Sequence, residues 1–382
     1  MAATSSQIEA GPNLSTYRRY LIILAFLVCT AFLMQANSSV FNFDGFIVSV
    51  LLVVVVALVL RHLFQRPTDR PWLAPLTILA LVAVFVLSRF TRFEIFLFGT
   101  HGQWIGFTYL ILRLIHTVVE SKQVGNVAIS DMTAYALFPP AIIAGPIHRA
   151  PQFLAQFASF PRRLSQYERI QSLERIGLGV IKKFVFASAL SLFALDSSIV
   201  YNPSVSRGVL WVALLAYGFM LYFDFAGYSD IAIGVAGLIG IKLPENFANP
   251  YAQPDITRFW QSWHITLSNW LRDYIFLPLS RVLLKRFGAR FSTPIMGISH
   301  LATMIIAGLW HAFTLNFVIW GLWHGAGLFV HAQWSRFIHQ RGGRSLPRVI
   351  AVAMTFAFVT LGWVFFALPD FSTSLHCFSR LF

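Results

Sequence analysis

The sequence is short of charged residues and of cysteine, and each shortage excludes a class of protein. Only 12% of its 382 residues are charged, whereas 57% are hydrophobic and the mean hydropathy is +0.67. A soluble domain could not cover its surface with so few charges, so we expect a polytopic membrane protein. The two cysteines, Cys29 and Cys377, provide no disulfide framework and have no metal-ligand spacing. We therefore expect neither a disulfide scaffold nor a metal site.

Three common catalytic motifs are also missing. There is no Gly-rich phosphate loop, no Gly-x-Ser-x-Gly elbow and no His-Glu-x-x-His zinc helix. Nucleophilic serine catalysis and zinc hydrolysis therefore lose support. The formal charge of +14 would suit nucleic acid, but the basic residues lie in short gaps between apolar runs instead of gathering on one face. We expect the lipid bilayer as a partner and no nucleic acid.

Long apolar runs predict transmembrane helices, because a span needs about 20 apolar residues and lipid cannot hydrogen-bond an open backbone. The runs lie near 17–36, 45–62, 72–90, 103–119, 174–195, 207–223, 226–241, 293–311, 313–332 and 347–368. Two further apolar segments, 132–147 and 256–280, do not resemble simple spans. The first contains Pro139-Pro140 and Gly145-Pro146, which predict a break and a re-entrant element.

These elements predict an all-α polytopic membrane protein. We expect about 10–11 transmembrane helices plus re-entrant and amphipathic segments. No internal repeat or long linker divides the chain, so 1–382 is predicted to be a single membrane-embedded domain. The first apolar run is followed by no convincing cleavage site and is predicted to remain as the first span.

Basic residues in the short gaps predict the orientation, since cytoplasmic loops are enriched in Lys and Arg. With these gaps inside, the N-terminus is cytoplasmic. Arg89 and Arg92 fit less well because they fall outside. The basic gaps are the tail (Arg18, Arg19), 61–70 (Arg61, Arg66, Arg70), 148–183 (Arg149, Arg162, Arg163, Arg169, Arg175, Lys182, Lys183), 281–290 (Arg281, Lys285, Arg286, Arg290) and 333–348 (Arg336, Arg341, Arg344, Arg348).

Histidines inside the apolar runs are the first candidates for chemistry. Trp310-His311 closes one run, Trp323-His324 lies in the next, and His264 lies 47 positions before His311. An ionisable group at membrane depth is a functional candidate by default. The alternative is a neutral histidine that serves only packing. Small residues beside His311 leave room for a substrate or, equally, for close helix packing, and Trp310 is expected mainly to pack, although its N–H could donate to an oxyanion.

The segment 254–280 gives two stripes when it is treated as one helix at 100° per residue. One stripe is aromatic. The other is polar and holds His264 at its centre. An amphipathic helix at the lipid headgroups and a cavity-lining helix explain this pattern equally well. The polar stripe consists of Thr257, Gln261, His264, Ser268 and Arg272.

Two carboxylates, Asp224 and Asp230, lie in an otherwise apolar region. Paired acids can handle protons or cleave glycosides, but nothing in the sequence fixes their separation. We expect a structural role, with Arg side chains or backbone N–H groups as partners at a break between two helices. With serine and zinc chemistry unsupported and the carboxylates expected to be structural, the remaining candidate is a histidine that acts as a general base. An imidazole with an unperturbed pKa of about 6.5 can accept a proton from a hydroxyl at neutral pH.

Ordered motifs over roughly 104–380 resemble the membrane-bound O-acyltransferase (MBOAT) family, whereas 1–103 resemble it only in hydropathy. The resemblance is to its bacterial branch, which includes membrane proteins of alginate O-acetylation and of D-alanine transfer to teichoic acid. The matching segments are 138–147 with 153–154, 222–230, 243–251, 259–274, 308–311 and 361–366. Departures are Gln261 and Ser262, where relatives often carry arginine, and Ala312 in place of Gly.

The resemblance implies a helical bundle around a tunnel, with His311 as catalytic histidine and His264 at the second active-site position. Ser268, Arg272, Asp273, Trp310, Asn246, Asp230 and His324 are candidates for donor binding or tunnel lining. The implied reaction moves an acyl group, with acetyl preferred, from acetyl-CoA or an acyl-carrier protein to a polysaccharide hydroxyl or to an extracytoplasmic partner acyltransferase. No cofactor is expected to stay bound, and the implied location is the bacterial inner membrane.

Two other functions remain open at this point. A channel or transporter would use the broken segment 132–147 and the carboxylates to line a path, but it predicts inverted internal symmetry, which the sequence lacks. A non-catalytic scaffold would recruit a soluble acyltransferase, and histidine substitutions would then leave activity intact.

Overall fold

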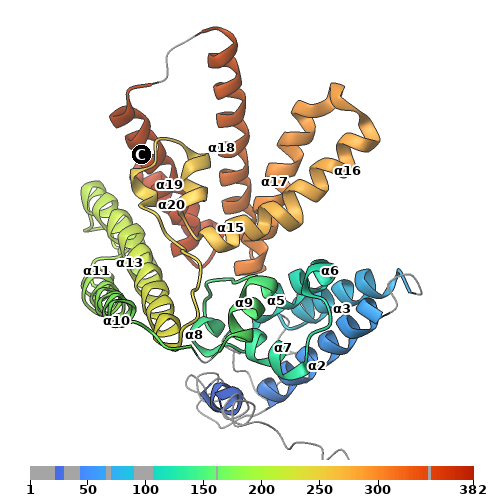
Figure 1. The fold of residues 1–382 in the computed structure, drawn as a ribbon. Helices are drawn as coiled ribbons and strands as arrows, with labels where there is room; N and C mark the ends of the chain where they lie inside the picture. Colours follow the sequence, from blue (N-terminus) through green and yellow to red (C-terminus); the bar gives the residue numbers. More distant parts are fainter. Residues whose placement is uncertain (1–21, 30–43, 66–69, 90–105, 161, 343–345) are drawn as a thin grey trace, which may run out of the picture. The chain divides into compact units, whose positions relative to one another are not determined.

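The structure is a computed structural model that describes residues 22–29, 44–65, 70–89, 106–160, 162–342 and 346–382. Within these ranges every regular element is helical, and Figure 1 shows no sheet. The predicted all-α class is therefore confirmed. Arg18, Arg19, Arg66, Arg92 and Arg344 lie outside the described residues, as does most of the predicted span 17–36.

Four described helices are long and apolar enough to cross a membrane, which supports the polytopic prediction. They are Ile47–Gln65, Arg207–Ile239, Ala289–His311 and Arg348–Ala367. Two shorter apolar helices, Leu73–Leu87 and Phe107–Val119, coincide with further predicted spans. The expected number of spans, the cytoplasmic side and the re-entrant placement of 132–147 stay predictions.

The chain forms two compact units, and the prediction of one domain stays a prediction. The first unit comprises 1–166 and 236–242. Its helices are α2 (Asp44–Gln65), α3 (Leu73–Leu87), α5 (Phe107–Val119), α6 (Ser121–Val124), α7 (Ile129–Ala136), α8 (Pro139–Ile142) and α9 (Ala150–Ala158).

Helix α5 is the core of the first unit, with all but one of the side chains from Phe107 to Val118 buried. Its Arg113, fully buried, donates hydrogen bonds to the carbonyl oxygens of Ala136, at 3.2 Å, and Ala141. Both acceptors lie in the segment 132–147, where the helix is interrupted between α7 and α8. The predicted break is confirmed, and Arg113 satisfies carbonyls that the interrupted helix leaves open.

The second unit comprises 167–235 and 243–382. Its helices are α10 (Gln166–Val180), η1 (Ile181–Ala187), α11 (Ser188–Ser191), α12 (Ser197–Tyr201), α13 (Arg207–Ile239, whose last residues belong to the first unit), η2 (Pro250–Ala252), α14 (Ile256–Ser262), α15 (Ile265–Leu271), η3 (Arg272–Phe276), α16 (Leu277–Phe287), η4 (Ala289–Phe291), α17 (Ser292–His311), α18 (Leu315–Gln340), α19 (Arg348–Ala367) and α20 (Phe371–Leu381).

Helix α13 is one helix of 33 residues, so the prediction of two spans, 207–223 and 226–241, is wrong. A break was expected because two carboxylates interrupt the apolar pattern. Instead, Asp224 pairs with Lys183, and Asp230 pairs with Lys182 and Arg175. Basic side chains from α10 and η1, which form one preceding helix, pair with the two carboxylates. The carboxylates therefore need no free backbone N–H groups, and α13 continues without a break.

Glycines allow α10 and η1 to pack closely against α13. A Cβ added at Gly227 would lie 2.7 Å from the Gly179 carbonyl oxygen and 2.7 Å from the Lys183 amide nitrogen. The two backbones therefore touch, as small residues allow in membrane helices. Figure 1 shows α10 and α11 running beside α13. This contact aligns the lysines of η1 with the carboxylates of α13.

The segment 254–280 is interrupted, so treating it as one helix was wrong. Helix α14 ends at Ser262, His264 has a left-handed backbone (φ +41°), and α15 begins at Ile265. A π-helical turn, η3, then leads into α16. The polar and aromatic stripes therefore do not share one helix surface.

Helices α17 and α18 pack closely and are joined by only three residues, 312–314. A Cβ at Gly308 would lie 2.1 Å from the Phe317 carbonyl oxygen, and one at Gly321 would lie 2.5 Å from the Met304 carbonyl oxygen. Only glycine permits this approach at both crossings. The tight turn places His311, the last residue of α17, against the first turns of α18.

Candidate functional site

A cavity of about 50 Å³ in the second unit brings the two candidate catalytic histidines together. They come from different segments, His264 from the break between α14 and α15, and His311 from the end of α17. Apart from Ser268, the remaining lining is apolar or aromatic. The cavity is lined by Leu221, Phe225, Trp260, Trp263, His264, Leu267, Ser268, Leu271, Met304, Ala307, His311, Trp320, Trp363 and Phe366.

Aromatic rings hold the His311 imidazole from several sides. Its ring centre lies 4.7 Å from that of Trp310, 5.0 Å from Phe366, 5.6 Å from Phe317 and 5.7 Å from Trp320. The residue is half-buried, so it is not walled in by its neighbours. Such packing restricts the plane of the ring, and His311 remains part of the cavity lining.

His264 is almost fully buried, with 3% of its surface exposed. Its Nδ1 lies 3.3 Å from Oδ1 of Asn246, and its ring packs edge-on against Phe225 at 4.6 Å. The left-handed backbone is uncommon for a residue with a Cβ, and such conformations cluster at functional sites. The break also lets Ser268 donate a hydrogen bond to the Trp263 carbonyl oxygen.

The other predicted site residues differ in how they relate to this cavity. Ser268 lines it, and Trp310 lies beside both histidines, 6.4 Å from His264. His324 lies behind the wall, its ring 5.1 Å from Trp260, and neither ring nitrogen has a hydrogen-bond partner among the described residues. Arg272 and Asp273 pair with each other in η3 and are not part of the lining.

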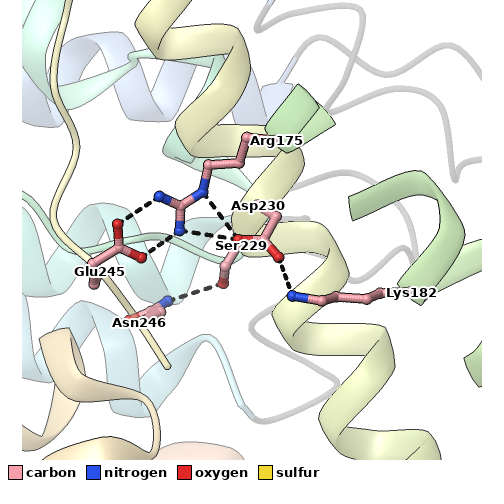
Figure 2. Close-up of polar contacts among 6 residues, drawn as sticks. All are labelled: Arg175, Lys182, Ser229, Asp230, Glu245 and Asn246. Atoms are coloured by element: carbon pink, nitrogen blue, oxygen red, sulfur yellow. Dashed lines mark hydrogen bonds and ion pairs between the residues drawn. The ribbon is translucent and has the colours of Figure 1, made fainter. Parts of the chain in front are cut away.

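A second cavity of the same unit, about 200 Å³, is lined mainly by polar groups. Figure 2 shows Arg175 between two carboxylates: both its terminal nitrogens donate to Glu245, and its Nε donates to Asp230 at 3.0 Å. Lys182 donates to the other oxygen of Asp230 at 2.6 Å. The predicted candidate Asp230 thus belongs to this cavity and has an arginine among its partners, as expected, although the helix break expected there is absent.

Lys182 and Lys183 of η1 could attract the phosphates of a donor only if their charges were unpaired. The structure pairs Lys182 with Asp230 and Lys183 with Asp224, so both positive charges are balanced by carboxylates. Arg162, in the first unit, donates from Nε to the Gly240 carbonyl oxygen. A donor would therefore meet less unpaired positive charge at Lys182 and Lys183 than the sequence alone suggests.

Asn246 lies at both cavities: it lines the polar one and holds His264 of the aromatic one. Its Nδ2 donates to Ser229, the neighbour of Asp230, at 3.2 Å (Figure 2). Ser229, Arg175, Glu245 and the wall residue Phe366 were not predicted as site residues. Ser229, Glu245 and Phe366 lie in the segments 222–230, 243–251 and 361–366, whose resemblance to the family motifs was the available signal. No such motif marks Arg175, which only the packing of α10 beside α13 brings to Asp230.

The described residues contain no group of three or more His, Cys, Asp or Glu side chains that could hold a metal ion. The chemistry available at the aromatic cavity is therefore that of two imidazoles, one hydroxyl and indole N–H groups. An imidazole can accept a proton from a hydroxyl, and buried N–H groups can stabilise a developing oxyanion.

Comparison with known proteins places the chain among acyltransferases. The model of the membrane-bound O-acyltransferase family matches residues 64–368. The chain is 33% identical over 284 residues to a "Probable alginate O-acetylase AlgI" of Pseudomonas syringae, which covers 73% of this chain and 51% of the relative. It is 36% identical over 252 residues to a peptidoglycan O-acetyltransferase of Helicobacter pylori, which covers 65% of this chain and 46% of the relative.

A third relative comes from a different envelope system. The chain is 32% identical over 292 residues to a teichoic acid D-alanyltransferase of Streptococcus thermophilus, which covers 72% of this chain and 67% of that protein. The chain thus spans about half the length of the alginate and peptidoglycan relatives and two thirds of this one.

Proposed function

We propose that this chain, which belongs to the membrane-bound O-acyltransferase family, transfers an acetyl group from a cytoplasmic thioester to a hydroxyl group for a cell-envelope polysaccharide. The observation that carries the proposal is the cavity that His264 and His311 share although 47 positions separate them. Two imidazoles in one aromatic enclosure supply a base and a second group that can share or return the proton.

The reaction needs one proton transfer and one acyl exchange. His311 takes the proton from the acceptor hydroxyl, whose oxygen attacks the thioester carbonyl carbon. The carbon–sulfur bond then breaks, and the thiolate leaves with the proton that the histidines hold. His264 orients the donor or shares that proton. The exclusion of water by the aromatic walls protects the thioester from hydrolysis.

The size of the cavity favours a short acyl group. A volume of about 50 Å³ holds only a few water molecules, since one probe sphere occupies roughly 10–15 Å³. An acetyl group is of that size. A long acyl chain would require the surrounding side chains to move, at the cost of repacking a dense interior. This supports acetyl over a fatty acyl group.

The acceptor is proposed from the relatives. Two of them are named for O-acetylation of alginate or peptidoglycan and one for D-alanylation of teichoic acid. All three names refer to a polymer, namely alginate, peptidoglycan or teichoic acid, so we propose a cell-envelope or extracellular polymer as the final product. We propose that transfer to the polymer proceeds directly or through an extracytoplasmic partner acyltransferase.

The orientation proposed from the basic gaps supplies the two substrates from opposite sides. With the basic gaps and the N-terminus in the cytoplasm, a donor such as acetyl-CoA or an acyl-carrier protein arrives from inside. The acceptor arrives from outside, across a bacterial inner membrane. No cofactor needs to remain bound in this scheme, because the thioester itself is the activated group.

The test compares three alanine variants in the purified protein and in cells. We expect His311→Ala to lower thiol release from acetyl-CoA, measured with an acceptor, by about 10²–10⁴-fold. His264→Ala should also lower it, whereas His339→Ala, an exposed histidine at the end of α18, should not. The acetyl content of the envelope glycan should follow the same order.

Unchanged acetylation by His311→Ala, at equal protein level, would reject the proposal. Solute flux into proteoliposomes without any acyl donor would favour a channel instead. Loss of activity with loop changes but not with either histidine change would favour a scaffold.

A further inference from the structure

We infer that Asn246 is a positioning residue that selects the His264 tautomer with its proton on Nδ1, so that Nε2 is the nitrogen that presents a lone pair to the reaction. The inference deepens the proposed function and rests on it for its catalytic meaning. The hydrogen bonds that carry it do not depend on which acyl group is moved.

The first step is the orientation of the Asn246 amide. Its Oδ1 accepts hydrogen bonds from the Thr266 backbone N–H at 3.3 Å and from the Thr266 hydroxyl at 2.7 Å. A backbone N–H can only donate, so the atom that faces it must be the amide oxygen. On the other side Nδ2 donates to the Ser229 hydroxyl at 3.2 Å. The usual ambiguity between amide oxygen and nitrogen is thereby removed.

The second step is the tautomer of His264. Its Nδ1 lies 3.3 Å from Asn246 Oδ1, an atom that can only accept. The contact is a hydrogen bond only if Nδ1 carries the proton. In a neutral imidazole the lone pair then lies on Nε2. The opposite tautomer would set two lone pairs against each other in a site where both residues are buried.

The third step is the rigidity of this arrangement. Asn246 is fully buried, and its backbone carbonyl oxygen accepts a hydrogen bond from the Ile265 N–H at 2.9 Å. The backbone of Asn246 is thus tied to the first residue of α15, one position after His264. The left-handed backbone of His264 is held from both sides, which fixes the ring relative to the amide.

This tautomer determines which nitrogen His264 presents in the cavity that it shares with His311. With Nδ1 tied to Asn246, His264 can offer only Nε2 to a substrate or to the proton that His311 collects. A histidine held by a second group through one nitrogen presents its other nitrogen in a fixed direction, as in a catalytic triad, and His264 could share the proton of His311 in this way. Here the orienting group is a neutral amide, so it sets the tautomer without adding charge.

The test is the tautomer of His264 in protein labelled with ¹⁵N in its histidine rings. We expect Nδ1 to give a pyrrole-type and Nε2 a pyridine-type ¹⁵N signal, assigned by the loss of both in His264→Gln. Asn246→Ala should shift part of the population to the other tautomer. Its kcat should fall about 10-fold, the worth of one strong neutral hydrogen bond, with KM within about 3-fold. Asn246→Asp retains an acceptor oxygen and should therefore keep the proton on Nδ1.

Asn316→Ala is the matched structural control. Asn316 is equally buried and donates to the Leu368 carbonyl oxygen and the Ser374 hydroxyl. Its loss should lower thermal stability and leave the His264 signals in place. If both asparagine changes lower stability alike and neither alters the His264 tautomer, Asn246 is only structural.

The wild-type spectrum decides the matter even if Asn246→Ala does not fold. A pyridine-type Nδ1 on His264 overturns the inference. Failure of the proposed function is distinguishable, because it would show as full activity of His311→Ala while the His264 signals remain as expected.

Discussion

Replacing Met304 with alanine is expected to change which acyl group the protein prefers. The Met304 side chain lines the aromatic cavity from α17 and is almost fully buried. The substitution removes about three heavy atoms from the wall. If an acetyl group occupies this cavity of about 50 Å³, as we propose, the enlarged cavity should have room for a butyryl group.

The expected magnitude follows from the two extra methylenes of butyryl. Each buried methylene is worth about 0.8 kcal/mol, so two are worth about 1.6 kcal/mol, or roughly 15-fold in the butyryl-to-acetyl ratio of kcat/KM. The same truncation leaves packing unfilled in the absence of butyryl. The variant should therefore lose about 2–5 kcal/mol of stability.

The assay measures thiol release from acetyl-CoA and butyryl-CoA by both proteins with one acceptor. Met296→Ala is the control, because it lies on the same helix about 12 Å away along the axis and outside the lining. Its acyl preference should stay that of the wild type. A ratio unchanged within about 2-fold in folded Met304→Ala protein would show that the acyl group does not occupy this cavity.

Two further predictions concern stability in the second unit and are measured by thermal unfolding of the detergent-solubilised protein. Gly227→Ala should lower the free energy of unfolding by about 1–3 kcal/mol through overpacking, because its Cβ would lie 2.7 Å from the backbone of α10 and η1. A Cβ at Gly177 meets nothing within 4 Å, so Gly177→Ala should be tolerated. Equal effects of the two substitutions would contradict the close contact. Asp230→Ala should lower the free energy of unfolding by about 1.5–3 kcal/mol, because it leaves Lys182 without its carboxylate and removes one of the two carboxylates that Arg175 contacts, the other being Glu245. Asp224→Ala breaks one half-exposed pair and should cost at most about 1 kcal/mol; the reverse order would refute the structural role of Asp230.

The helical class and most helix positions could be predicted because hydropathy acts locally. The runs 45–62, 293–311 and 347–368 coincide with α2, α17 and α19 within a few residues. The break in 132–147 was predictable for the same reason, since two prolines act on their own backbone. That Arg113 would satisfy the freed carbonyls was not predictable, because it lies on a different helix.

The uninterrupted course of α13 could not be predicted from its own residues. Two carboxylates in an apolar run favour a break when nothing is known of their partners. The partners lie in 175–183, and only the glycine contact between Gly179 and Gly227 brings them into reach. A helix of 33 residues is about 50 Å long, more than the roughly 30 Å of the hydrocarbon core. Asp230, about 35 Å from Arg207 along the helix axis, can therefore lie beyond the apolar layer.

The break at His264 shows why a helical wheel misplaced part of the site. On one continuous helix, Ser268 and Arg272 would follow His264 on a single polar face. In the structure, Ser268 lines the cavity, whereas Arg272 is not part of the lining and pairs with Asp273. The interruption is maintained by Asn246, whose backbone and side-chain oxygens take the N–H groups of Ile265 and Thr266.

Asn246 thus explains both why the helical-wheel prediction for 254–280 was wrong and how the His264 ring is oriented. Asn246 accepts two backbone N–H groups at the start of α15, which a continuous helix would have used internally. Because it also holds Nδ1 of His264, helix start and ring orientation are set by one side chain. A sequence pattern records neither link, since 18 positions separate the two residues and the contact forms only after folding. The family motifs mark where chemistry occurs, and the hydrogen bonds around Asn246 explain why the backbone must be broken there.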